Sequence, residues 1–177
     1  LDSPTPSQKI TETPSTPLIM AHWSQGSPYN ELCPEDVDGP GGHALVGCVA
    51  IAMGQIMKYY NYPPQGEGSH SYYANGYGNQ TVNFGNNDYE FYNMPYSTNE
   101  DNMDLAKFLY HCGVGAEMNY GAEGSGAWVS TACESMEDNF KYSSNWDYDN
   151  RNNYTDSQWK ALIKNETKNP KNNKKGA

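Results

Sequence analysis

The chain has 177 residues, a formal net charge of −10 at pH 7 and only 18% charged residues. This length suits one domain with a sizeable core. The acidic balance argues against a nucleic-acid partner, because phosphate contacts need a basic face.

No apolar run reaches the roughly 20 residues that a membrane span requires, so no membrane partner is expected. A sequence rich in Tyr, Asn, Ser, Thr and Gly favours an exported protein of bacterial type. No signal-peptide pattern is present, and a targeting segment is therefore expected upstream or already removed. We expect a secreted protein, extracellular or periplasmic.

Residues 1–17 are rich in proline, Ser and Thr and predict an extended linker. The ordered domain should begin near residue 18, after a junction with something upstream.

The segment "GCVAIAMGQIMKYY" predicts a helix over 48–60, with Gly47 before it and "NYPP" at 61–64 ending it. Its apolar residues cover nearly all directions of the helical wheel. A helix that is apolar all round is buried, so this one is expected at the centre of the fold.

Alternating aromatic and polar residues around Asn-Gly and Gly-Asn predict hairpin strands within 68–93. A second helix is predicted in "NEDNMDLAKFLYHCG", residues 99–113. It carries one apolar face, made of Leu105, Phe108, Leu109 and Cys112.

A Gly/Ser loop at 119–127 leads to a third predicted helix at 128–140. Its stripe at helical spacing consists of Val129, Ala132, Cys133, Met136 and Phe140. A fourth helix is predicted from Thr155, whose spacing to Gln158 suits a capping box. Residues 164–177 show no hydrophobic periodicity and are predicted to be disordered.

The four cysteines, Cys33, Cys48, Cys112 and Cys133, include no C-x-x-C pair, so no zinc ribbon is expected. Two of them lie on apolar helix faces, which favours free thiols. His22, His70 and His111 have no carboxylate or cysteine at ligand spacing. Neither a metal nor any other cofactor is expected.

Cys48 is the candidate nucleophile. A cysteine in the first turn of a helix lies among unpaired backbone N–H groups at the positive end of the helix dipole, and both favour the reactive thiolate. The alternative is a small hydrophobic residue in a buried helix. Gln25 alone would be an ordinary solvated side chain. It is a candidate site residue only if Cys48 is the nucleophile, because its side-chain amide can donate to a developing oxyanion.

These residues and their flanks resemble the streptopain family of papain-like cysteine peptidases. The similarity rests on "WSQGSPYN", "CP", "GHALVGCVAIAMGQIMKYYNYP", "CGVGAEMNYGAEGSG", "EDNFKY" and "SQWKALIKNE", and covers roughly residues 18–166. It implies a papain-like α+β fold in which Cys48 heads the central helix. The implied activity is hydrolysis of protein or peptide substrates through an acyl-enzyme.

The resemblance also implies roles for individual residues. Cys48 would be the nucleophile, and the Gln25 amide with the Cys48 backbone N–H would form the oxyanion hole. Gly124, Ser125 and Gly126 would hold the substrate backbone. An inhibitory prodomain would precede the domain, which agrees with the proline-rich start.

The sequence departs from the family where the catalytic histidine is expected, because no residue matches the family's later Gly-His-Ala segment. His43 is five residues before Cys48 and is expected to be a loop residue, since a catalytic base rarely comes from the same short loop. We therefore expect residues 18–166 to be a partial catalytic domain that lacks the C-terminal part of its sheet. Followed by a tail at 167–177, it should be inactive alone. The rival hypothesis is a non-catalytic extracellular fragment that binds a propeptide, an inhibitor or carbohydrate.

Overall fold

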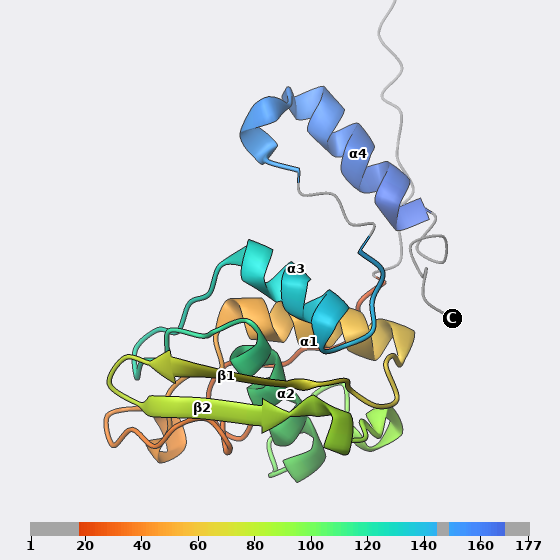
Figure 1. Cartoon of the computed structure of the whole chain (residues 1–177). Coiled ribbons are helices and arrows are strands. Elements are labelled where there is room, and N and C mark those ends of the chain that lie inside the picture. The colour runs from red at the N-terminus through yellow and green to blue at the C-terminus, as the bar shows by residue number, and fades with distance from the viewer. Residues whose placement is uncertain (1–17, 145–148, 169–177) are drawn as a thin grey trace, which may run out of the picture.

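The computed structural model describes residues 18–144 and 149–168 (Figure 1). These residues form four α-helices and a two-stranded antiparallel sheet. In chain order the elements are α1 (Cys48–Tyr60), β1 (Ser69–Ala74), β2 (Gly78–Asn83), α2 (Met103–Gly115), α3 (Val129–Asp138) and α4 (Asp156–Lys168), with short 3₁₀ turns between them. The expected α+β class is confirmed. None of the helices in the described residues is long and apolar enough to cross a membrane.

Helix α1 has the predicted limits. It begins directly after Gly47, whose φ is 90°. At its other end Asn61 adopts a left-handed conformation, and its N–H bonds to the carbonyls of Met57 and Lys58. A glycine before the first turn and a left-handed residue after the last are local signals, so the sequence marks both ends of this helix.

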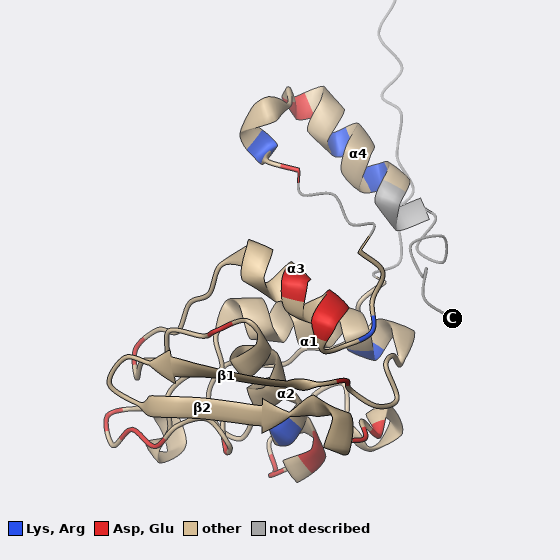
Figure 2. Ribbon diagram, in the orientation of Figure 1, with Lys and Arg blue, Asp and Glu red and all other residues tan. Residues whose placement is uncertain are grey.

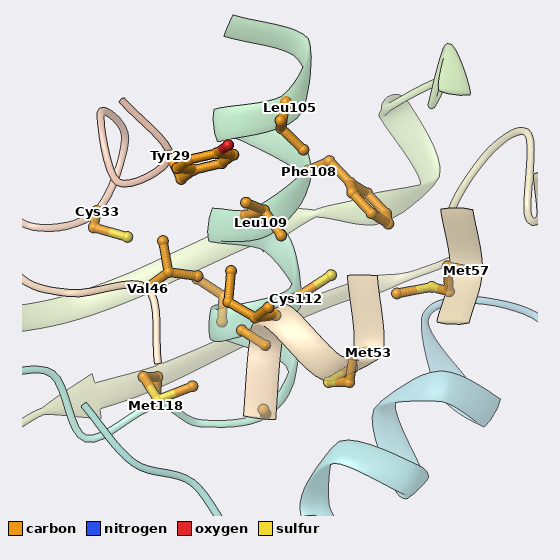
Figure 3. Close-up of a cluster of buried hydrophobic side chains, with 14 of the residues drawn as sticks. Tyr29, Cys33, Val46, Met53, Met57, Leu105, Phe108, Leu109, Cys112 and Met118 are labelled. Carbon is orange, nitrogen blue, oxygen red and sulfur yellow. The ribbon is translucent and has the colours of Figure 1, made fainter. Parts of the chain in front are cut away.

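Helix α1 packs against α2 and α3, and α2 also packs against both strands of the hairpin (Figure 1). The four residues predicted to share one face of α2 are all buried. Figure 3 shows this face pointing toward Met53 and Met57 of α1 and toward Val46, which precedes α1. The interface between α1 and α2 is therefore the centre of the core.

The prediction that α1 is buried on all sides is wrong for one face. Ala52 is exposed, and Ile56 retains 38% of its accessible surface. The buried residues of α1 include Ala50, Ile51, Met53 and Met57. The single charged residue, Lys58, is buried instead. Its ammonium donates to the Phe91 carbonyl, and burial lowers its pKa.

The predicted hairpin is present at 69–83, with Ala74 paired to Gly78 across its turn. After β2 the chain forms 3₁₀ turns that bury Phe84 and Phe91. Tyr89 lies between them, and its hydroxyl is 3.0 Å from Nδ1 of the buried His111. Burial lowers the pKa of His111 to about 4, so this imidazole is a neutral part of the core.

Helix α3 is shorter than the predicted 128–140 and ends at Asp138. Of the predicted stripe, Ala132 in the helix and Phe140 just after it are in the core, but Val129 remains half exposed. The capping box before α4 is confirmed. Oε1 of Gln158 accepts from the Thr155 N–H at 2.9 Å, and Oγ1 of Thr155 accepts from the Gln158 N–H at 3.4 Å.

The expectation of disorder from residue 164 is wrong for the first residues, because α4 continues through Lys168. Lys and Glu make up three of the five residues 164–168 and have high intrinsic helix propensity, so the helix continues here without further apolar periodicity. The predicted linker at 1–17 and the rest of the tail lie outside the described residues. Figure 2 shows the acidic character of the α1–α3 body, whereas the α4 region also carries Arg151, Lys160 and Lys164.

Candidate active site around Cys48

Cys48 is the first residue of α1, and its side chain is exposed. The first helical hydrogen bond runs from the Ile51 N–H to the Gly47 carbonyl at 3.1 Å. The backbone N–H groups of the first turn, which carries the thiol, therefore have no partner within the helix. An anion at this position is stabilised by those donors and by the helix dipole.

The segment that carries Gln25 lies beside the approach to Cys48. The Val46 N–H donates to the Gln25 carbonyl at 2.9 Å, which joins two points 21 positions apart in the chain. The same segment is anchored by Trp23, whose indole N–H donates to the Pro95 carbonyl at 2.8 Å. Gln25 is only partly buried.

The loop at 119–126 borders the same approach from the other side. The Leu45 N–H donates to the Gly121 carbonyl at 3.1 Å, and Asn119 and Gly126 exchange backbone hydrogen bonds of 2.8 and 3.1 Å. A Cβ atom placed on Gly47 would lie 3.3 Å from Cβ of Ser125. This loop is therefore in contact with the residue that precedes the thiol.

Within this loop, the three residues expected at the substrate differ in role. The Ser125 hydroxyl accepts from the Gly121 N–H at 3.0 Å and so braces its own loop. Gly124 and Gly126 are exposed, and a Cβ atom at either would meet nothing within 4 Å. The backbone N–H and carbonyl of Gly126 are both bonded to Asn119, so it is Gly124 whose exposed backbone is available to a ligand.

The imidazole of His43 binds a backbone carbonyl and not the Cys48 thiol. Its Nδ1 lies 2.8 Å from the carbonyl oxygen of Cys33, to which the ring donates. Its backbone pairs with Glu35. The ring of His43 is thus used to hold the loop before α1.

The other three histidines are also engaged elsewhere or exposed. His70 pairs with Glu117 at 3.1 Å, His111 bonds Tyr89 in the core, and His22 is on the surface. All four histidines of the chain are in the described part, and there none forms a hydrogen bond with the Cys48 thiol. The same part contains no group of three or more His, Cys, Asp or Glu side chains arranged to hold a metal ion.

The four cysteines are free thiols, as expected. Burial raises the pKa of Cys33 to about 12 and that of Cys112 well above its usual value. Burial, with a smaller contribution from Glu134, also raises the pKa of Cys133. Cys48 is the exposed thiol of the four, which separates it from the others chemically.

Sequence reasoning missed two residues that shape this region. The thioether of Met118 lies against Gly47, so close that a Cβ atom on that glycine would be 2.5 Å from Sδ. The buried side chain of Asn30 contacts three carbonyl groups of the loop before α1. Asn30 stands in the motif "WSQGSPYN", but the sequence offers no sign of which carbonyls it meets.

Comparisons with known proteins place this arrangement in a family. The model of the peptidase C10 family matches residues 23–173. Streptopain of Streptococcus pyogenes is 31% identical in an alignment of 161 positions that covers 80% of this chain and 40% of streptopain. The thiol protease/hemagglutinin PrtT of Porphyromonas gingivalis is 30% identical over 175 residues, covering 93% of this chain and 20% of PrtT. The chain thus spans less than half the length of either relative.

Two solved structures share the fold. The active wild-type interpain A cysteine protease of Prevotella intermedia superimposes with a TM-score of 0.72 at 36% identity, over 84% of this chain and 63% of that one. A prointerpain A fragment from the same organism gives 0.75 at 34% identity, over 84% and 50% of the two chains. The chain therefore belongs to the peptidase C10 family.

Proposed function

We propose that Cys48 is the nucleophile of a cysteine endopeptidase that cleaves proteins or peptides. The observation that supports this most is an exposed thiol at the first turn of the helix that crosses the core. In the proposed reaction the Cys48 thiolate attacks a peptide carbonyl, and the C–N bond then breaks to release an amine and leave a thioester. Water adds to the thioester, which frees the acid and returns the thiol.

The negative oxygen of each tetrahedral intermediate requires donors in front of α1. We assign this role to the Gln25 side-chain amide and the Cys48 backbone N–H, since the Gln25 carbonyl is bonded two residues before Cys48. The exposed backbone of Gly124 would bind the substrate main chain, in a loop that Ser125 and the bonds between Gly126 and Asn119 hold in shape.

Proton transfer requires a histidine that the described contacts do not offer. The rings of His43, His70 and His111 are bonded to other groups. General acid–base catalysis contributes roughly 10²–10⁴-fold to such reactions. We therefore propose that these 177 residues supply the nucleophile and the oxyanion donors, and that turnover needs an imidazole from outside them.

Thiol reactivity separates this proposal from that of a non-catalytic binding fragment. In the native chain, iodoacetamide should alkylate Cys48 much faster than Cys133, the next most accessible thiol, as read by peptide mass spectrometry. Cys48→Ser should abolish the fast phase, while casein cleavage by the chain alone should stay at background. Equal alkylation of Cys48 and Cys133 would favour the binding fragment, and robust thiol-dependent casein cleavage would contradict the proposed need for an external histidine.

An inhibitory prodomain and an extracellular or periplasmic site of action are further proposals. The first is supported by the similarity to a prointerpain fragment, and the second by a composition poor in charged residues and rich in Asn, Ser, Thr and Tyr. Cell fractionation with an antibody against the chain tests the location, and a purely cytoplasmic signal would contradict it.

A further inference from the structure

Asn30 is a fully buried amide that lies under the loop leading to Cys48. Its Nδ2 is 2.8 Å from the Pro40 carbonyl oxygen, 3.1 Å from that of His43 and 3.2 Å from that of Ala44. Three acceptors around one atom identify this atom as the nitrogen, because an oxygen would be repelled. Its two hydrogens are shared among the three carbonyls.

The loop that Asn30 contacts has little conformational preference of its own. Gly41, Gly42 and Gly47 all have positive φ, at 72°, 83° and 90°. Glycine populates positive and negative φ with similar ease, so the local sequence does not fix the path to Cys48. Contacts from elsewhere in the chain must fix it, and Asn30 provides three of them from one side chain.

Asn30 also belongs to the segment 23–30, which carries Gln25. The backbone bond from the Val46 N–H to the Gln25 carbonyl ties this segment to the end of the loop. The Asn30 side chain ties the same two segments together nearer the loop's start. The two proposed oxyanion donors, the Gln25 amide and the Cys48 N–H, therefore stand on segments that Asn30 links.

We propose that Asn30 is a positioning residue that sets the spacing between the Gln25 side chain and the Cys48 backbone N–H. This inference rests on the proposed function of those two groups. Asn30 acts through the loop carbonyls and touches neither the thiol nor a substrate.

Asn139 provides a comparison within the same molecule. It is also buried, but both ends of its amide are bonded: Oδ1 accepts from the Ser135 hydroxyl at 3.0 Å and Nδ2 donates to the Glu67 carbonyl at 3.4 Å. Oδ1 of Asn30 is buried with no hydrogen-bond partner in the described part of the chain. A buried oxygen without a partner destabilises the fold, so the contribution of Asn30 lies in the contacts of its nitrogen.

The test compares Asn30→Ala with Asn139→Ala in the full 177-residue chain. Each variant removes a buried amide, so both lose stability, and circular dichroism and urea titration establish that each is folded under the assay conditions. The probe is a peptide aldehyde. The Cys48 sulfur adds to its carbonyl carbon and the thiol proton ends on the oxygen, which then occupies the oxyanion site. Binding is read from protection of Cys48 against iodoacetamide, whose displacement reaction forms no oxyanion.

We expect Asn30→Ala to weaken aldehyde binding by about 10- to 100-fold, the scale of a misplacement near 1 Å. Asn139→Ala should stay within about threefold of the parent chain, because distant sites act independently. In a Gln25→Ala background the effect of Asn30→Ala should shrink, since the two residues serve one pocket. If Asn30→Ala does not fold, Asn30→Ser against Asn139→Ser provides the same comparison.

Equal losses of aldehyde binding in the two asparagine variants would overturn the inference and leave Asn30 with a structural role alone. An unchanged affinity in Asn30→Ala would overturn it as well, with the proposed function intact. If the parent chain binds no aldehyde and Cys48 alkylates no faster than Cys133, the proposed function fails first and the inference fails with it.

Discussion

Replacing Gly47 with alanine places a methyl group against the buried thioether of Met118, directly before Cys48. The glycine has φ 90°, and the new Cβ would lie 2.5 Å from Sδ and 2.6 Å from Cε of Met118. Two separate penalties follow. The backbone conformation, with φ 90° and ψ 139°, costs an alanine about 1–3 kcal/mol, and displacing the buried thioether costs about 1–3 kcal/mol. Alanine also reduces the conformational entropy of the unfolded chain, which stabilises the folded state by about 0.4–1 kcal/mol and offsets part of these costs.

The net expectation for Gly47→Ala is a loss of about 3 kcal/mol in the free energy of unfolding. Gly76→Ala is the matched control, because Gly76 has φ 84° in the hairpin turn and nothing within 4 Å of an added Cβ. Gly76 also has a positive φ but none of the crowding, and its replacement should lose about 1 kcal/mol of stability. The contact with Met118 is measured separately by the double variant below.

Urea unfolding at 25 °C, followed by intrinsic fluorescence, measures both losses. Because Met118 is fully buried, Met118→Ala is itself destabilising, but combined with Gly47→Ala it should lose less than the two single changes together. The reasoning is refuted if Gly47→Ala is no less stable than Gly76→Ala, or if the double variant shows simple additivity.

Three further outcomes are expected. His111 has a pKa lowered to about 4 in the fold, so its contribution to the free energy of unfolding should be complete above pH 6.5 and fall by about 3 kcal/mol as the pH drops to about 4. Urea unfolding at a series of acidic pH values should show a shallower fall for His111→Gln than for the parent chain. Identical curves for the two proteins would contradict this. Cys33, with its pKa raised to about 12, should resist alkylation at pH 8 until urea unfolds the chain, and rapid native labelling would be the contrary result. Gln25→Ala should weaken peptide-aldehyde binding about tenfold or more and leave the rate of Cys48 alkylation by iodoacetamide unchanged. Equal losses in aldehyde affinity and in alkylation rate would show that Gln25 does not stabilise the oxyanion.

Local signals made the ends of the elements predictable. Gly47 and the residues after Tyr60 mark α1, and the reciprocal side-chain bonds of Thr155 and Gln158 mark the start of α4. What covers a helix face depends on distant segments, and for this reason the exposure of Ile56 did not follow from its apolar character.

In the candidate site, too, the sequence predicts the local features but not the contacts between distant segments. Cys48 is identifiable from its position at a helix start, but the contact between Gln25 and Val46 joins residues far apart in the chain. The pairing of Gln25 with Cys48 therefore came from family resemblance and not from spacing. The position of Met118 against Gly47 and the three carbonyls around Asn30 are non-local contacts too, and only the folded arrangement reveals them.

The glycines before Cys48 make this short loop fragile to mutation. Every single-base change that alters a glycine codon's amino acid yields a residue with a Cβ atom or a stop. Such a Cβ would stand 2.0 Å from the His43 carbonyl oxygen at Gly39, 2.9 Å from Ser27 at Gly41 and 2.5 Å from Met118 at Gly47. Gly42 has open space, but its φ of 83° penalises any side chain. Random mutagenesis of the gene should therefore deplete variants in this loop far more than in the β1–β2 turn, where comparable φ angles face water.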